Sequence, residues 1–124
     1  MRIGEAGDRG APARALQEAR IRAYLAGLVD EALIEEHRRR PVGHHSPALA
    51  EVLAFLRQAP VAGKLALVAS VPGREWRVVR LSGRQGEPHE PVGSDVYRSE
   101  DEARHALFLR RLEEAGLVGG SRGG

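Results

Sequence analysis

Cysteine, asparagine and threonine are absent from this chain of 124 residues, and aromatic residues make up only 4% of it. The absence of cysteine excludes disulfides and thiolate metal sites. With so few aromatic rings, the chain has no interleaved platform on which nucleic-acid bases would stack. No apolar run approaches the roughly 18 residues of a membrane span, and no charged segment leads into an apolar one as in a signal peptide. We therefore expect a cytoplasmic protein without a membrane segment.

The residues that are present fit one small globular domain, with 42% hydrophobic and 29% charged residues. The 19 basic and 17 acidic residues leave a formal net charge of only +2, which does not indicate a nucleic-acid partner. Both ends are rich in glycine, so residues 1–11 and 117–124 are expected to be disordered tails. Residues 12–116 are expected to form a single domain, which at this size benefits from a partner.

Apolar residues at helical spacing predict a helix over residues 12–37. Gly27 weakens a helix interior and Asp30 can cap a new start, so a break is plausible between two helices. The second, shorter helix should stop before Pro41, because the residue before a proline avoids the helical region.

A further helix is predicted to start at Ser46 and Pro47, since serine caps free amides and proline is tolerated in the first turn. This helix should end before Pro60. It carries one apolar face, formed by Leu49, Val52, Leu53 and Leu56.

The pattern then changes to strands. Residues 64–71 form a short apolar run, residues 76–81 alternate, and Pro72-Gly73 between them suits a type II turn. We expect an antiparallel hairpin, followed by a long loop over residues 82–98, which would be functional, bound to a partner or disordered. The fold class is therefore α+β, with helices at both ends around a small antiparallel hairpin in the order α-α-β-β-α, and with disordered termini.

The last helix is predicted to begin after Ser99, which forms a capping box with Glu102. It should run to Ala115, with Gly116 as its left-handed cap.

Apolar residues of this last helix fall on two nearly opposite faces. The first face carries Ala103, Ala106 and Leu107 and can meet the hairpin. A small domain has little left to cover the second face, so we expect a second chain to cover it. The expected partner interface consists of Phe108, Leu109, Leu112 and Ala115.

Two adjacent histidines, His44 and His45, precede the Ser46 helix start in a chain with five histidines. As neighbours in an extended segment they would point in opposite directions and not easily share a metal ion. The other three, His37, His89 and His105, lie at no recognised metal-ligand spacing. We interpret His44 and His45 as a polar lead-in to the helix cap, with a metal or proton-transfer role as the less favoured alternative.

Two further motifs suggest chemistry and fall short of it. Glu102 and His105 form one Glu-x-x-His, but di-iron sites need two such motifs and two more carboxylates, so we interpret the motif as a salt-bridged surface pair. Lys64 follows a glycine as in a phosphate loop, but the earlier glycine is replaced by Gln58 and the following Ser/Thr by Leu65. We therefore assign this chain no catalytic, cofactor-binding or metal-binding residue.

Arginine clusters leave another class of function open. Arg38, Arg39, Arg40 and the pair Arg110-Arg111 could contact phosphates, which would make the chain a free-standing binding or regulatory module for nucleic acid. A homodimer joined through the last helix is a third possibility.

Several stretches together resemble the small, or alpha, subunit of N,N-dimethylformamidase. They are "EEHRRRPVGHHSP", "FLRQAPVAGK", "SVPGREWRVVRL" and "YRSEDEARHALFLRRLEE", in the same order and with short gaps. The likeness covers residues 35–114. The strand "KLALVASV" and the N-terminal segment match weakly.

The resemblance implies an amide hydrolase of small and large chains that converts dimethylformamide and water to dimethylamine and formate. It also implies that the catalytic iron lies in the large chain, held there by tyrosine and glutamate. This chain would then be a non-catalytic structural partner with no cofactor of its own, in a hetero-oligomer of two copies of each chain or a multiple of that. Neither nucleic acid nor membrane is expected as a partner.

Overall fold

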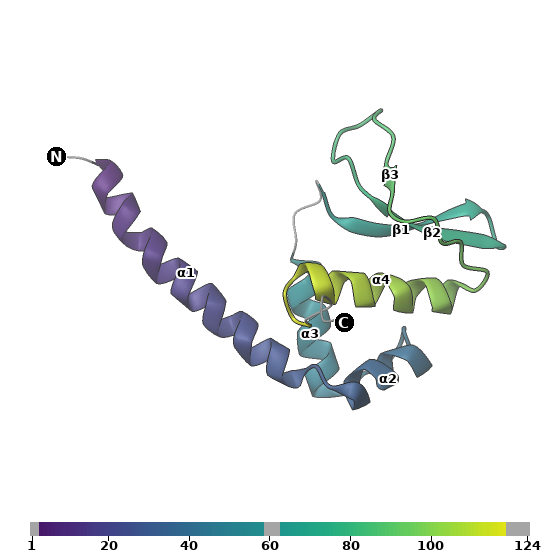
Figure 1. The fold of residues 1–124 in the computed structure, drawn as a ribbon, viewed down its shortest axis with the longest axis horizontal. Coiled ribbons are helices and arrows are strands. Elements are labelled where there is room, and N and C mark those ends of the chain that lie inside the picture. The colour runs from purple at the N-terminus through teal and green to yellow at the C-terminus, as the bar shows by residue number, and fades with distance from the viewer. Residues whose placement is uncertain (1–2, 59–62, 119–124) are drawn as a thin grey trace.

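The computed structural model describes residues 3–58 and 63–118, with side chains from residue 12 onward. This part of the chain forms four helices and a three-stranded antiparallel sheet in the order β1-β2-β3, which confirms the predicted α+β class (Figure 1). The elements are α1 (Ile3–Leu28), α2 (Glu31–Arg39), α3 (Pro47–Arg57), β1 (Leu65–Val71), β2 (Glu75–Arg80), β3 (Glu90–Pro91) and α4 (Glu100–Glu114). None of the helices described is long and apolar enough to cross a membrane.

Helix α1 begins at Ile3 instead of near Pro12, so residues 3–11 are helical where a disordered tail was expected. Extending an existing helix adds one hydrogen bond for each residue fixed, without the unfavourable nucleation step, so weak helix formers can continue it. The predicted break is confirmed. Asp30 caps α2 by accepting a hydrogen bond from the Leu33 amide at 2.8 Å.

Local capping also starts α3. Ser46 Oγ accepts a hydrogen bond from the Leu49 amide at 3.2 Å, and Pro47 lies in the first turn, as predicted. The helix ends at Arg57, and Pro60, which was expected to terminate it, lies outside the described residues.

The predicted hairpin is confirmed. Strands β1 and β2 pair antiparallel from Leu65↔Arg80 to Val71↔Glu75, and Gly73 in the connecting turn has a φ of 74°. The following segment does not stay a loop throughout. Strand β3 pairs with β2, and Tyr97 forms an isolated bridge with Trp76. The outer edge of β2 would otherwise present unpaired backbone groups, and the returning chain satisfies them.

Helix α4 lies between the sheet on one side and the other helices on the other (Figure 1). It contacts β1, β2 and α2, while α3 contacts α1 and α2. The buried core between the helices consists of Leu25, Leu33, Leu49, Val52, Leu56, Phe108, Leu112 and Leu117.

The two apolar faces predicted for α4 are therefore both used inside the chain. Phe108 and Leu112 are only 3% and 0% exposed, because they pack in the helical core. Ala115 packs against the edge of this core, and Leu109 is 36% exposed. The chain's own helices cover the face for which a second chain was expected, and of the four expected interface residues Leu109 is the exposed one.

A reversal of the chain after α4 brings Leu117 back onto the core. Gly116 has a φ of 76°, its amide donates to the Glu113 carbonyl at 3.1 Å, and the Leu117 amide donates to the Leu112 carbonyl at 2.9 Å. This is the Schellman arrangement, in which a residue just past the helix packs on its last turn. Leu117 is 3% exposed, so it belongs to the folded domain and not to the expected tail. Residues 119–124 of that tail lie outside the described residues.

The same end of α4 also contacts the first helix. Arg22 Nε of α1 donates to the carbonyl oxygen of Ala115 at 2.9 Å, across 93 positions of sequence. This hydrogen bond ties α1 to the C-terminal end of the domain.

Truncating a core leucine of α4 should destabilise the chain far more than truncating its exposed neighbour. Leu112→Ala should lower the free energy of unfolding by about 2–5 kcal/mol, because it removes buried contacts and leaves a cavity. The matched control Leu109→Ala changes an exposed side chain of the same helix and should cost less than about 1 kcal/mol. Urea unfolding of the full chain followed by circular dichroism measures both. Equal losses for the two variants would contradict the packing described.

Candidate functional site

His37, on the last turn of α2, is buried in the helical core. It is 3% exposed, and no other polar or charged residue of the described chain is as deeply buried. Its ring stacks on that of Phe108 in α4, with the ring centroids 3.9 Å apart and the planes inclined by 14°. The packing of α2 on α4 therefore places an imidazole among apolar side chains.

A second histidine satisfies this buried ring. His105 Nδ1 of α4 lies 3.0 Å from His37 Nδ1. Two protonated nitrogens cannot share a hydrogen bond, so one must accept, and at least one of the two rings must be neutral.

His45 completes the histidine cluster, defined as His37, His45 and His105. Its ring lies nearly parallel to that of His37, with the centroids 6.3 Å apart. His45 Nε2 donates to the Arg40 carbonyl oxygen at 2.8 Å, so the ring holds the turn after α2 against the end of that helix. The interpretation of His45 as part of the lead-in to α3 fits this contact. His44 beside it is exposed.

Glu36 holds the same turn through hydrogen bonds to Ser46. One carboxylate oxygen accepts from the Ser46 amide and the other from Ser46 Oγ, each at 2.7 Å. These hydrogen bonds, from the amide first and the hydroxyl second, hold the pKa of Glu36 below its ordinary value. The carboxylate therefore connects α2 to the N-cap of α3 and sets where His45 lies.

Burial keeps His37 and His105 neutral. Loss of hydration lowers the pKa of His37 to about 4, and the neighbouring His105 and His45 lower it further in smaller measure. Burial is also the main cause that lowers the pKa of His105, followed by the charge of Arg38. At neutral pH both rings are therefore uncharged and hold α2 to α4 by stacking and hydrogen bonding.

The cluster does not form a metal centre. Among the described side chains, those of residues 12–58 and 63–118, no three of His, Cys, Asp or Glu come together in a way that could hold a metal ion. Structural and catalytic zinc or iron sites use three or four protein ligands. The described residues therefore do not fit a resident iron site.

The interpretation of Glu102 and His105 as a surface ion pair was wrong. His105 turns inward to His37, and the described side chains include no ion pair between Glu102 and His105. The Glu102 amide donates to Ser99 Oγ at 3.3 Å, which confirms Ser99 as the N-cap. The described hydrogen bonds do not include the return bond from the Ser99 amide to the Glu102 side chain that completes a capping box. The contact between His37 and His105 was missed, although His37 follows the buried Leu33 by four positions and so continues its apolar stripe.

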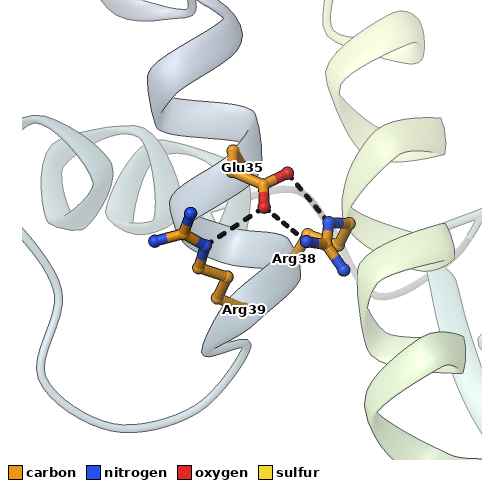
Figure 2. Close-up of polar contacts among 3 residues, drawn as sticks. All are labelled: Glu35, Arg38 and Arg39. Atoms are coloured by element: carbon orange, nitrogen blue, oxygen red, sulfur yellow. Dashed lines mark hydrogen bonds and ion pairs between the residues drawn. The ribbon is translucent and has the colours of Figure 1, made fainter.

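The arginine clusters are partly neutralised by the chain itself. Figure 2 shows Glu35 between Arg38 and Arg39 on the exposed face of α2. Its carboxylate accepts from both Arg38 nitrogens Nε and Nη2 and from Arg39 Nε, the latter at 3.1 Å. These contacts, above all the hydrogen bonds from Arg38, lower the pKa of Glu35 to about 2. Arg111 turns inward, where its Nη2 donates to the Leu65 carbonyl oxygen at 2.7 Å.

Comparison with known proteins identifies related chains. A family model described as N,N-dimethylformamidase alpha subunit matches residues 12–120. The chain is 35% identical over 114 residues to an N,N-dimethylformamidase alpha subunit from Alcaligenes sp., covering 86% of this chain and 83% of that protein. It is 32% identical over 113 residues to the N,N-dimethylformamidase alpha subunit of Paracoccus aminophilus, covering 86% of this chain and 78% of that protein.

The histidine cluster predicts how stability depends on pH. The folded pKa of His37 lies near 4, below the ordinary value of 6.5, so the unfolded chain binds a proton at a higher pH than the folded chain. The contribution of neutral His37 to the free energy of unfolding is therefore complete above about pH 6.5. It is lost as the pH falls toward 4, where the loss reaches about 3 kcal/mol. Urea unfolding at several pH values between 7.5 and 4 measures this loss.

Carboxylates also titrate between pH 4 and 6.5, so the test compares the pH dependence of unfolding between the unmodified chain and a variant that lacks the His37 ring. His37→Asn keeps a polar group near the position of Nδ1 but does not titrate, and it should flatten the pH dependence relative to the unmodified chain. The control His44→Asn, at an exposed histidine, should leave the slope unchanged. An unchanged slope in His37→Asn would show that the buried ring is not the group responsible.

Proposed function

The chain belongs to the N,N-dimethylformamidase alpha subunit family, and from this premise we propose that it is the non-catalytic small subunit of an iron-dependent amide hydrolase. The family match over residues 12–120 carries the proposal. The reaction proposed is the hydrolysis of dimethylformamide, in which the C–N bond breaks, the oxygen of water goes to the formyl carbon and a proton goes to the leaving nitrogen. The products are formate and dimethylamine.

The active site and its iron are assigned in this proposal to a larger partner chain. Metal-assisted hydrolysis needs several convergent ligands, and the described residues of this chain do not bring such a set together. His37 is also unsuited to proton transfer with substrate, because its side chain is only 3% exposed. We therefore assign this chain the task of binding and orienting its partner.

Helix α1 offers the surface that best fits such a partner. It extends away from the rest of the domain (Figure 1) and contacts mainly α3. In the part of α1 whose side chains are described, three large side chains are exposed, with Leu16 at 54%, Ile21 at 42% and Tyr24 at 55%. Apolar and aromatic side chains of this size are typical of the centre of protein interfaces, where burial releases water from them. We place the contact with the large chain on α1, within an assembly of two copies of each chain or a multiple of that.

Co-purification with the large chain tests this proposal. The tagged chain, expressed with the gene for its partner, should bring down a larger iron-containing protein that releases dimethylamine from dimethylformamide. Leu16→Asp should reduce the amount of partner recovered by at least about tenfold, because it buries a charge in an apolar contact. The unfolding of the isolated chain should not change, since Leu16 is exposed.

Two matched variants separate the possible results. Leu109→Asp, at the exposed residue of the expected α4 interface, should leave recovery nearly unchanged if α1 is the contact and should reduce it if α4 is. His44→Ala should leave turnover intact. Loss of turnover in His44→Ala with the complex still assembled would contradict the non-catalytic role. A chain that recovers no partner and binds duplex DNA in a salt-sensitive way would favour the nucleic-acid module instead.

A further inference from the structure

A hollow of about 310 Å³ lies beside the histidine cluster, between the turn after α2, the C-terminal half of α3 and one face of α4 from Arg104 to Arg111. The charged side chains that line it are all basic, namely Arg57, Arg104 and Arg111. His37 and His45 also line it, and no aspartate or glutamate is among the described residues of its wall. The hollow therefore concentrates positive charge, and its wall itself contains no carboxylate.

Arg111 is the least satisfied of these side chains. It is half-buried, its Nη2 donates to the Leu65 carbonyl oxygen, and its Nε is buried without a hydrogen-bond partner among the described residues. Burial, followed by the charge of Arg57, lowers the pKa of Arg111. A guanidinium that loses hydration beside a second one is unfavourable unless an anion compensates for it.

The chain supplies such an anion to several of its arginines, but not to Arg57 or Arg111. Arg38, Arg80, Arg84 and Arg104 each form an ion pair with a glutamate. For Arg57 and Arg111 the described side chains provide no ion pair. Of the three arginines at the hollow, only Arg104 is thus partly neutralised, through Glu100 at 2.5 Å on its own helix.

The uncharged part of the wall indicates what else the ligand carries. Leu53, Leu56, Leu107 and Phe108 line the hollow together with the turn after α2. Leu56 and Phe108 are nearly buried, but a bare carboxylate or phosphate would leave the half-buried Leu53 and Leu107 in contact with water. A ligand with one carboxylate and an apolar body satisfies both parts, because the planar fork of arginine matches two carboxylate oxygens and the body covers the leucines.

We propose that the hollow binds a carboxylate between Arg57 and Arg111, with the apolar part of the ligand against Leu53 and Leu107. The carboxylate belongs either to a small free acid or to an aspartate or glutamate side chain of another protein, and the chemistry of recognition is the same. The site is built from this chain's own residues and does not rest on the proposed enzymatic role.

Butyrate is the probe for this site, because it joins a carboxylate to a short apolar chain. Titration of butyrate into the full chain at neutral pH should shift the NMR signals of the His37 and His45 rings, which line the hollow. Butyramide has nearly the same shape without the charge and should bind at least about tenfold more weakly. Equal binding of the two would overturn the proposal, as would no shift with butyrate.

A pair of arginine variants tests the position of the site. Arg57→Gln, at an exposed residue whose loss leaves the core intact, should raise the Kd of butyrate by about tenfold. Arg74→Gln makes the same charge change at an exposed residue of the β1–β2 turn and should change the Kd by less than about twofold. Equal effects of the two variants on the Kd would show that butyrate responds to the net charge of the chain and not to this site, and would overturn the proposal.

The same titration in the co-purified complex distinguishes the two sources of the carboxylate. If the complex binds butyrate with the same sensitivity to Arg57→Gln, the site takes a free acid. If the complex excludes butyrate and Arg57→Gln also lowers recovery of the partner, an acidic side chain of the partner occupies the hollow. Both results support the carboxylate site.

Discussion

Helix α4 joins the sheet to the other helices, and the rest of the domain depends on its burial along two sides. With only five aromatic residues, the chain must build its core mainly from leucine and valine side chains. On one side of α4, Phe108 and Leu112 pack against the other helices. On the other side, the strands β1 and β2 cover it. Because one helix serves both layers, the sheet and the other helices each depend on α4 to cover their apolar side.

This arrangement explains why a polar ring is tolerated in the interior. His37 stacks on Phe108 and shares a hydrogen bond with His105, so its Nδ1 has a hydrogen-bond partner without water. A leucine there would fill the space but would leave His105 unpaired. The histidine cluster thus specifies how α2 meets α4, and the link from Glu36 to Ser46 specifies how α3 follows.

Local signals in the sequence predicted the places where elements begin and end. Ser46, Ser99 and Gly116 act within a few residues of themselves, so their capping roles could be inferred without the fold. The resemblance to the family was also found from short stretches that occur in the same order along the sequence, and the family match agrees with it.

Features that depend on distant residues could not be predicted in the same way. The wheel of α4 indicated two apolar faces, but not that α2 and α3 would cover the second one. Strand β3 exists because β2 has an open edge, which its own residues do not reveal. The contact between His37 and His105 joins residues 68 positions apart, and neither ring lies in a motif that indicates the other.

The hydrogen bond from Arg22 to the end of α4 has a consequence for how the chain folds. It joins residues 93 positions apart, and the contacts of α4 with α2, β1 and β2 likewise link the last helix to earlier parts of the chain. Without α4, the helices α1, α2 and α3 can contact one another, but their core lacks Phe108 and Leu112 and the hairpin lacks the helix that covers it. The core is therefore completed only when α4 docks, so folding depends on contacts between distant residues and is slow relative to a bundle of local contacts.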